Sequence, residues 1–413
     1  MPSNRQWLLK ERPTGMIGPE HFELVESPMP SPDLDAGQAL VKNLMLGFDP
    51  AMRGWVQDTR SYLPPVPLGE PMRASGVGQV IRSTNPDYPE GSLVQGLLNW
   101  QEYSIADPAS GMPLQVLPDG ISPGMALSVF GTTSLTAYFG LLDVGQPKAG
   151  ETVLVSGAAG ATGSAVAQIA RLKGCRVVGI AGGPEKCQWL RDACRIDAVI
   201  DYKYEDIDQR LSELCPDAVD VFFDNVGGET LDIALDHMAD FGRVVLCGAI
   251  SGYNDEAQRA GPGNLMHIVT RRLRVQGFIV IDYLDRAEDA FKDLAEWVMS
   301  GYLAWREDVQ EGFENIPATL QRLFDGRNRG KQQLKLADPA SLSTACPVDK
   351  YGDTPPQRHR RQAGSGCDTV IARTRRPSLL GQKINNLANF RSVFFAPGGE
   401  TPKKIVPGAA MWI

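Results

Sequence analysis

Short apolar runs, separated by proline and glycine, fill the first 125 residues of the chain. The runs cover residues 39–46, 76–81, 93–98 and 102–105, and prolines gather at residues 28–32 and 64–67. Short strands at regular intervals, bounded by such residues, are typical of a barrel-like or open β domain. The N-terminal part is therefore predicted to be a β domain.

From residue 151 onward, apolar runs alternate with amphipathic segments. Strands are predicted at 152–156, 176–180, 198–200, 219–223, 243–249 and 274–281, and helices at 161–173, 184–193, 205–214 and 287–300. Strands that alternate with helices of roughly 10–15 residues indicate βαβ units, a parallel sheet and helices on both faces. The predicted fold class is α/β, with a doubly wound parallel sheet beside the β domain.

The last part of the chain has a different composition. Residues 338–413 hold 11 Lys and Arg against 5 Asp and Glu, in a chain whose net charge is −8. No sustained apolar period runs through this stretch, so it is predicted to be a poorly ordered basic tail. A length of 413 residues exceeds what one core usually supports, which favours two domains before this tail.

Composition and charge exclude several classes of protein. The net charge of −8 argues against a nucleic-acid binder, and no apolar run is long enough to span a membrane. The first residues lack the apolar stretch of a secretory signal. Seven scattered cysteines without a CxxC pair and four histidines without ligand spacing predict neither disulfides nor a bound metal. A reducing, cytoplasmic location is expected.

A glycine-rich turn follows the strand at 152–156. Gly157, Gly160 and Gly163 are spaced every third residue, and a helix is predicted immediately after. Small residues allow the backbone to turn sharply and approach a pyrophosphate, which the helix N-terminus then attracts. Glycines alone are often just a loop, but the strand before and the helix after favour a dinucleotide site.

The end of the second strand indicates which dinucleotide binds. An NAD site usually carries an acid here for the ribose 2′-hydroxyl, whereas residues 178–183 contain none. Pro184 begins the next helix, and Lys186 lies in its first turn. A 2′-phosphate would meet a helix N-terminus and a lysine, so NADP(H) is predicted. The alternative for Lys186 is an ordinary solvated lysine.

Several motifs carry a family resemblance over about residues 5–336. SGAAGATG at 156–163, DNVGG at 224–228, CGAISGYN at 247–254 and DPAMRG at 49–54 resemble the zinc-independent medium-chain dehydrogenases/reductases. Within that superfamily the chain is similar to prostaglandin/leukotriene reductases and alkenal double-bond reductases. The resemblance implies a GroES-like substrate domain at 1–130, completed by about 301–337, and an NADP-binding Rossmann domain at 131–300.

The resemblance also implies site residues and a reaction. The expected cofactor contacts at the adenosine end are Gly160, Ala161, Thr162, Gly163, Lys186 and Tyr202, and Asn225 is expected at the carboxyl edge of the sheet. Those at the nicotinamide end are Cys247, Gly248, Ala249, Ile250, Ser251, Tyr253, Phe278, Ile279, Val280 and Asn328. The implied reaction is NADPH-dependent reduction of the C=C bond of an α,β-unsaturated aldehyde or ketone. A homodimer is compatible with these features.

Two tyrosines are the candidate catalytic residues. Hydride transfer to the β-carbon of an enone leaves an enolate oxygen, which a tyrosine hydroxyl can stabilise and protonate. Tyr283, after the strand predicted at 274–281, and Tyr62 match family tyrosines in such roles. Ala51 stands where some members carry a tyrosine. Two alternatives stay open: a quinone reductase, and a non-catalytic NADPH-binding scaffold of crystallin-like type.

Overall fold

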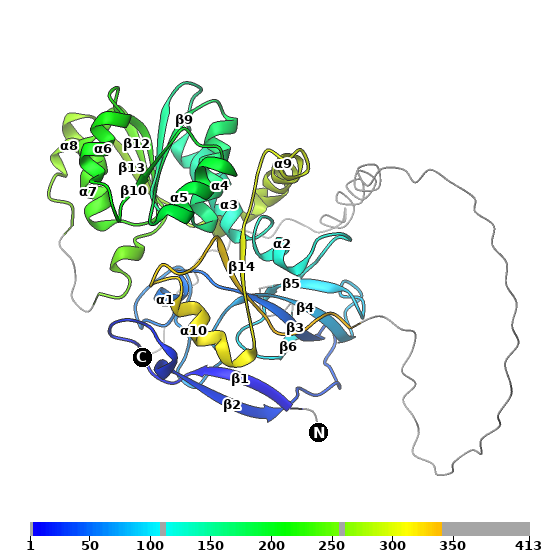
Figure 1. Cartoon of the computed structure of the whole chain (residues 1–413). Helices are drawn as coiled ribbons and strands as arrows, with labels where there is room; N and C mark the ends of the chain where they lie inside the picture. The colour runs from blue at the N-terminus through cyan, green and yellow to red at the C-terminus, as the bar shows by residue number, and fades with distance from the viewer. Residues whose placement is uncertain (1–2, 108–112, 256–260, 341–413) are drawn as a thin grey trace, which may run out of the picture. The chain divides into compact units, whose positions relative to one another are not determined.

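The computed structural model describes residues 3–107, 113–255 and 261–340 (Figure 1). The predicted basic tail lies, from residue 341 onward, outside the described residues. Among the helices that are described, none combines the length and the apolar character needed to cross a membrane.

An antiparallel sheet forms most of the N-terminal part. Its strands are β3 (Ala39–Gly47), β4 (Ser75–Ser83), β5 (Leu93–Leu97), β6 (Tyr103–Ala106) and β7 (Gln115–Val116). β3 pairs with β4 and with β6, so it lies at the centre. A separate hairpin joins β1 (Ser3–Leu9) to β2 (Phe22–Pro28). Trp100 is completely buried between Phe22 and Phe48, with ring centroids 4.7 and 5.9 Å away.

A returning segment completes this sheet from the other end of the described chain. β14 (Glu307–Glu311) pairs parallel with β15 (Lys331–Lys335), and β15 pairs antiparallel with β3. At the start of β15, the Lys331 ammonium is buried and lies 2.5 Å from the Asp49 carboxylate. Burying one charge without the other would be costly, so this pair fixes the returning strand against the loop that follows β3. The residue boundaries of the two domains remain a prediction.

The second sheet is six-stranded and entirely parallel. Its order is β10-β9-β8-β11-β12-β13. From β8 the chain adds strands toward one edge of the sheet, and from β11 it adds strands toward the other. The strands are β8 (Thr152–Val155), β9 (Arg176–Ala181), β10 (Ala198–Asp201), β11 (Val219–Asp224), β12 (Met238–Leu246) and β13 (Arg274–Gly277). This is the order of a Rossmann domain, in which ligands bind where the strand order reverses.

Helices connect and cover these strands. The α-helices are α1 (Met52–Trp55), α2 (Pro123–Leu127), α3 (Thr132–Phe139), α4 (Ala161–Leu172), α5 (Pro184–Asp192), α6 (Ile207–Leu214), α7 (Gly228–Asp236), α8 (Met266–Thr270), α9 (Ala287–Met299) and α10 (Ile316–Gln321). Short 3-10 turns occupy η1 (Pro19–His21), η4 (Ile250–Gly252), η5 (Val280–Arg286) and η6 (Phe313–Asn315), and η3 (Gly140–Gly145) is a π-helix.

The apolar runs of the parallel strands explain this arrangement. Val153, Leu154 and Val155 are all fully buried, because both faces of the sheet are covered. Leu154 belongs to a core that also includes Leu211 of α6 and Leu235 of α7. The α/β fold class, with a GroES-like antiparallel sheet and a Rossmann sheet, is thereby confirmed.

The structure corrects several predicted elements. β12 covers 238–246 instead of 243–249, and α7 was not predicted at all. The strand predicted at 274–281 ends at Gly277, where its partner strand β12 ends at Leu246. An edge strand with no partner beyond that point cannot continue its ladder, so the chain forms η5 instead. β14 was missed because Glu307–Glu311 is a polar sequence that shows no apolar pattern.

Candidate functional site

The glycine turn lies at the carboxyl end of β8. Gly157 adopts a positive φ of 57°, and Gly160 is the N-cap residue of α4. A Cβ on Gly163 would collide with the carbonyl oxygen of Gly157, so the turn requires glycine there. The first N–H groups of α4, on Ala161, Thr162 and Gly163, have no partner inside the helix and form a potential anion site.

A buried carboxylate ties this turn to the neighbouring strand. Asp224, at the end of β11, is fully buried and accepts a hydrogen bond from the Ser156 hydroxyl over 2.7 Å. The same Ser156 oxygen accepts from the Asn225 backbone N–H at 2.8 Å, and the Asn225 side-chain amide donates to the Ser156 carbonyl at 2.7 Å. The two central strands are therefore locked together at the point where the sheet order reverses.

Asp224 also shapes the loops on its other side. Its carboxylate accepts from the backbone N–H groups of Val226 (2.9 Å) and Gly227 (3.0 and 3.1 Å), while its carbonyl oxygen accepts from those of Cys247 and Gly248. Burial raises the pKa of Asp224, although the bonds from Gly227, Ser156 and Val226 oppose that rise. These donors satisfy the carboxylate inside the protein.

Positive charges gather at the end of β9, where a lysine was predicted to meet a phosphate. Lys186 is in the first turn of α5 and donates to the Gly326 carbonyl at 2.9 Å. Burial lowers the pKa of Lys186, and the nearby charges of Lys203 and Arg329 lower it further, while the carboxylates of Asp308 and Glu185 oppose the change. Lys203 and Arg329 were missed by the sequence interpretation. Three cations that crowd together favour an anionic ligand.

The acidic residue of the same turn is neutralised by partners. Glu185 forms ion pairs with Arg306 at 2.8 Å and with Arg329 at 2.7 Å. These arginines come from the returning segment, which also carries Gly326 and Asn328. Asn328 bonds to the Gly330 carbonyl, and its loop contacts α5 through Lys186 and Glu185. The structure thus places the loop of Asn328 against the first turn of α5, and the assignment of Asn328 to the nicotinamide end stays a prediction.

Tyr202 lies on the other side of the same turn. It is 53% exposed, and a Cβ on Gly182 would lie 2.6 Å from its ring. The adjacent Asp201 carboxylate accepts from the Gly183 and Lys203 backbone N–H groups, so its charge is held by the backbone. The end of β9 is thus open for an adenosine group without a free acid beside it.

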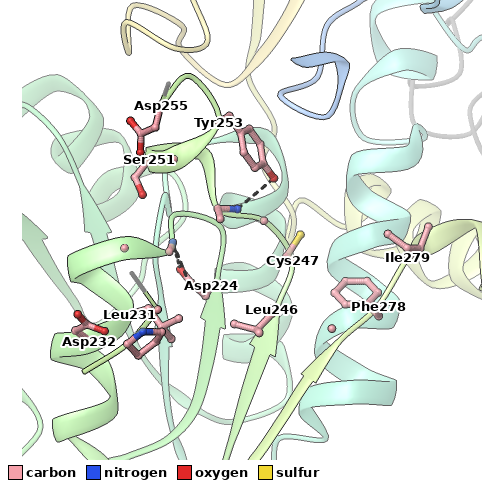
Figure 2. A pocket seen from close by; sticks show the side chains of 18 of the residues that line it. Asp224, Leu231, Asp232, Leu246, Cys247, Ser251, Tyr253, Asp255, Phe278 and Ile279 are labelled. Carbon is pink, nitrogen blue, oxygen red and sulfur yellow. Dashed lines mark hydrogen bonds between the residues drawn. The ribbon is translucent and has the colours of Figure 1, made fainter. Parts of the chain in front are cut away.

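A cavity of about 990 Å³ lies at the carboxyl ends of β11, β12 and β13 (Figure 2). Seven of the residues predicted for the nicotinamide end line it: Cys247, Gly248, Ala249, Ser251, Tyr253, Phe278 and Ile279. Ile250 and Val280 adjoin this lining at the starts of η4 and η5. Four acidic residues are also part of the lining: Asp224, Asp232, Asp255 and Asp282.

The Tyr253 side chain closes the turn after β12 by a hydrogen bond within that turn. The Ala249 backbone N–H donates to the Tyr253 hydroxyl at 3.1 Å, as Figure 2 shows. A Cβ on Gly248 would lie 2.9 Å from that hydroxyl, which explains the glycine. Because the hydroxyl oxygen accepts this bond, its own proton can be donated elsewhere. Burial raises the pKa of Cys247 to about 12, so its thiol stays protonated.

Tyr62 is electrostatically coupled to this turn from the N-terminal sheet domain. The Trp55 indole N–H donates to its hydroxyl at 2.9 Å, which again leaves the hydroxyl proton for another acceptor. Burial raises the pKa of Tyr62, and Cys247 contributes to the rise. Burial also raises the pKa of Tyr253, to which Cys247 and Tyr62 add smaller contributions. Tyr62, Tyr253 and Cys247 are therefore electrostatically coupled.

Tyr283 belongs to an aromatic cluster. Its ring stacks on Phe139 at a centroid distance of 5.1 Å and meets Phe278 edge-on at 6.3 Å. Gly140 makes room for Phe278, whose ring would collide with a Cβ there. Phe278 lines the cavity, so Tyr283 lies one ring behind that wall.

A buried arginine joins two of the motifs found in the sequence. Arg53, which is 3% exposed, donates through Nε to the Asn254 side-chain oxygen at 2.9 Å. It also donates to the carbonyls of Pro13 and Gly15. The sequence interpretation gave Arg53 and Asn254 no role, although both lie in the motifs DPAMRG and CGAISGYN.

Possible metal ligands are dispersed in the described residues. No group of three or more His, Cys, Asp or Glu side chains in that part of the chain is arranged to hold a metal ion. The described cysteines, Cys175, Cys187, Cys194, Cys215 and Cys247, are free thiols.

Two family models match the chain. One describes the N-terminal domain of oxidoreductases and matches residues 5–114; the other is named zinc-binding dehydrogenase and matches residues 161–300.

Individual relatives match this chain over nearly their whole length. The NADPH-dependent curcumin reductase of Escherichia coli (strain K12) is 39% identical over 340 residues, which are 81% of this chain and 97% of the relative. An NADP⁺-dependent 2-alkenal reductase of Nicotiana tabacum is 37% identical over 334 residues, 80% of this chain and 96% of its own. A solved structure of CurA from Vibrio vulnificus in complex with NADPH is 38% identical, with a TM-score of 0.77, and covers 81% of this chain and 100% of that one.

Replacement of the buried carboxylate tests the lock between the strands. Asp224→Asn would turn an amide N–H₂ toward backbone donors, so the free energy of unfolding should fall by about 2 kcal/mol. Urea unfolding measures this change, with Asp192→Asn as the exposed control. A variant as stable as the wild type would show that Asp224 is not what holds the turn.

Proposed function

The chain belongs to the medium-chain dehydrogenases/reductases, in the branch of curcumin, prostaglandin and alkenal reductases, and we propose that it reduces α,β-unsaturated aldehydes or ketones with NADPH. The product is the saturated aldehyde or ketone. The observation that carries the proposal is the cavity at the carboxyl ends of β11, β12 and β13, whose lining includes Cys247, Tyr253 and Phe278.

The residues present fit NADPH. The glycine turn can close tightly because a Cβ on Gly163 would collide with the Gly157 carbonyl oxygen, and the closed turn would offer the first N–H groups of α4 to a pyrophosphate. Lys186, Lys203 and Arg329 supply positive charge for a 2′-phosphate, and the acid Glu185 beside them is already paired. When bound, NADPH supplies the hydride. The residues of the 247–253 turn, with Phe278 and Ile279, would hold the nicotinamide end.

The tyrosine hydroxyls would act on the substrate oxygen. As the C=C bond is reduced, negative charge develops on the carbonyl oxygen, and a correctly placed hydroxyl donor stabilises it. Tyr62 and Tyr253 each accept a bond from an N–H group, so each can offer its own proton to that oxygen. Their raised pKa values keep both hydroxyls protonated at neutral pH.

An oxidation assay tests the proposed reaction. Loss of NADPH absorbance should be fast with a panel of 2-alkenals and enones and slower with quinones, because the donors fit a single carbonyl oxygen. Product analysis should find the saturated carbonyl compound. Absence of turnover across the enals and enones, in the presence of bound NADPH, would contradict the proposal.

Removal of Lys186 tests the choice of cofactor. A charge-assisted contact with phosphate contributes about 1.5–3 kcal/mol, so Lys186→Ala should weaken NADPH binding by about one to two decades. NADH binding should change little, because NADH has no 2′-phosphate. Titration of both cofactors measures this, with the exposed Lys292→Ala as control. Equal affinity of the wild type for NADPH and NADH would refute the assignment.

Three single Tyr→Phe variants rank the proton donors. Loss of one donor to a developing oxyanion can lower kcat by about 10²–10³. We expect a loss approaching this size in Tyr253→Phe, and about tenfold in Tyr62→Phe, because neighbouring donors compensate in part. NADPH affinity should be preserved, and the exposed Tyr302→Phe serves as control. If Tyr283→Phe shows the large loss while the other two keep the wild-type rate, Tyr283 is the donor, as predicted from the sequence.

A further inference from the structure

The short helix α1 carries side chains that reach toward both proposed proton donors. Its Trp55 indole N–H donates to the Tyr62 hydroxyl at 2.9 Å. Its Arg53 donates through Nε to the side-chain oxygen of Asn254, also at 2.9 Å, and Asn254 directly follows Tyr253 in the chain. One tyrosine is thus contacted by α1 itself, and the other lies one residue away from a contact with α1.

Arg53 is fixed by three acceptors. Besides the bond to Asn254, its guanidinium donates to the backbone carbonyls of Pro13 at 3.1 Å and Gly15 at 3.0 Å, and almost none of the residue is exposed. In the described part of the chain no carboxylate forms an ion pair with it, so neutral oxygens compensate for its burial. A planar guanidinium donates in fixed directions, and Arg53 therefore defines where the Asn254 oxygen lies.

The turn after β12 is held to other segments at its middle and at its end. At its middle, the Ser251 backbone N–H and hydroxyl donate to the Val226 carbonyl, at 3.1 and 2.7 Å. At its end, the Asn254 side-chain oxygen accepts a second bond, from the Ile17 backbone N–H at 3.3 Å. Tyr253 lies between these two points, so a displacement of Asn254 is passed on to Tyr253.

The position of the Tyr253 hydroxyl matters for the proposed reaction. Tyr253 lines the cavity, and its raised pKa, which burial mainly causes, has a contribution from Tyr62, so the two side chains interact. A proton donor must lie within hydrogen-bond reach of the reacting oxygen. Misplacement by about 1 Å can slow a reaction by about 10²-fold. The contacts that set this position therefore influence the rate.

We infer that Arg53 and Asn254 are positioning residues for the reduction, and that their hydrogen bond sets where the Tyr253 hydroxyl meets the substrate oxygen. This inference rests on the proposed function, in which Tyr253 donates to that oxygen. The cavity lining among the described residues includes neither Arg53 nor Asn254, so both act through Tyr253. The motifs DPAMRG and CGAISGYN, which are far apart in the sequence, thereby serve one purpose.

A leucine at position 254 removes the acceptor and keeps the size of the side chain. In a single-turnover reduction of benzylideneacetone by enzyme saturated with NADPH, Asn254→Leu should lower the rate by about ten- to a hundredfold. In the steady state, kcat and kcat/KM should fall by the same factor, because the donor acts in the transition state. NADPH affinity should change little, because the cofactor phosphates are expected at the glycine turn and at Lys186.

Conservative variants separate the hydrogen bond from general packing. Asn254→Asp keeps an oxygen that Arg53 can reach, so it should retain a rate close to that of the wild type. Arg53→Lys lacks the planar fork and should lose rate as Asn254→Leu does. The matched control is Asn85→Leu. The Asn85 side chain also joins two loops, through the Gly37 carbonyl and the Asp87 N–H, but none of these three residues lines the cavity, and the rate should be unchanged.

A double-mutant cycle determines whether the effect passes through Tyr253. In a Tyr253→Phe background no hydroxyl is left to misplace, so the addition of Asn254→Leu should lower the rate little further. In a Tyr62→Phe background the same addition should cost its full factor. A purely structural role predicts the same factor in both backgrounds. Rates are expressed per NADPH-binding site, so a partial loss of folded protein cancels.

The outcomes separate this inference from the proposed function. If the wild type reduces the enone and Asn254→Leu keeps its rate, the positioning role is wrong and the reductase stands. The same holds if Asn254→Asp loses as much as Asn254→Leu, or if the loss persists in full without the Tyr253 hydroxyl. If the wild type reduces no enal or enone while NADPH binds, the proposed function fails, and this inference fails with it.

Discussion

The Asp224 carboxylate is the group on which the candidate site depends. It lies without solvent exposure where the parallel sheet reverses its order, and four hydrogen bonds from Ser156, Val226 and Gly227 reach it. A buried charge is tolerated only when donors surround it. The loops that supply those donors also adjoin the cavity at the carboxyl ends of the strands. The hydrogen bonds that satisfy the carboxylate therefore also set the shape of that cavity.

A second constraint comes from contacts between distant parts of the chain. Arg53 joins residues 13–15 to Asn254, and Lys331 joins the returning strand to Asp49. Tyr62 thus belongs to a domain that these two contacts hold together. Tyr253 is held by the hydrogen bond from the Ala249 N–H in its own turn. Each tyrosine hydroxyl accepts from an N–H group, which leaves its own proton available for another acceptor. Hydrogen bonds among neutral groups thus prepare both hydroxyls to meet a developing negative charge.

Local pattern was sufficient for the nucleotide-binding half. A buried apolar strand, glycines at every third position and a helix are consecutive in the sequence, and backbone sterics permit few ways of connecting them. The missing acid after β9 and the lysine at the start of α5 are equally local, so the interpretation of Lys186 needed no tertiary information. β13 shows the limit of this approach. Its apolar run continues past Gly277, but the strand stops because its partner stops.

What the sequence by itself determined is the α/β fold class, the place of the glycine turn between β8 and α4, and the family resemblance, since each depends on neighbouring residues. Only the tertiary structure decided that Arg329 lies near Lys186, that Tyr62 is coupled to Cys247, and that Tyr283 stacks on Phe139. These pairs are joined by the packing of strands that are far apart in the chain. A charged or aromatic side chain carries no local signal of such a partner, because the partner's distance depends on how the whole sheet is assembled.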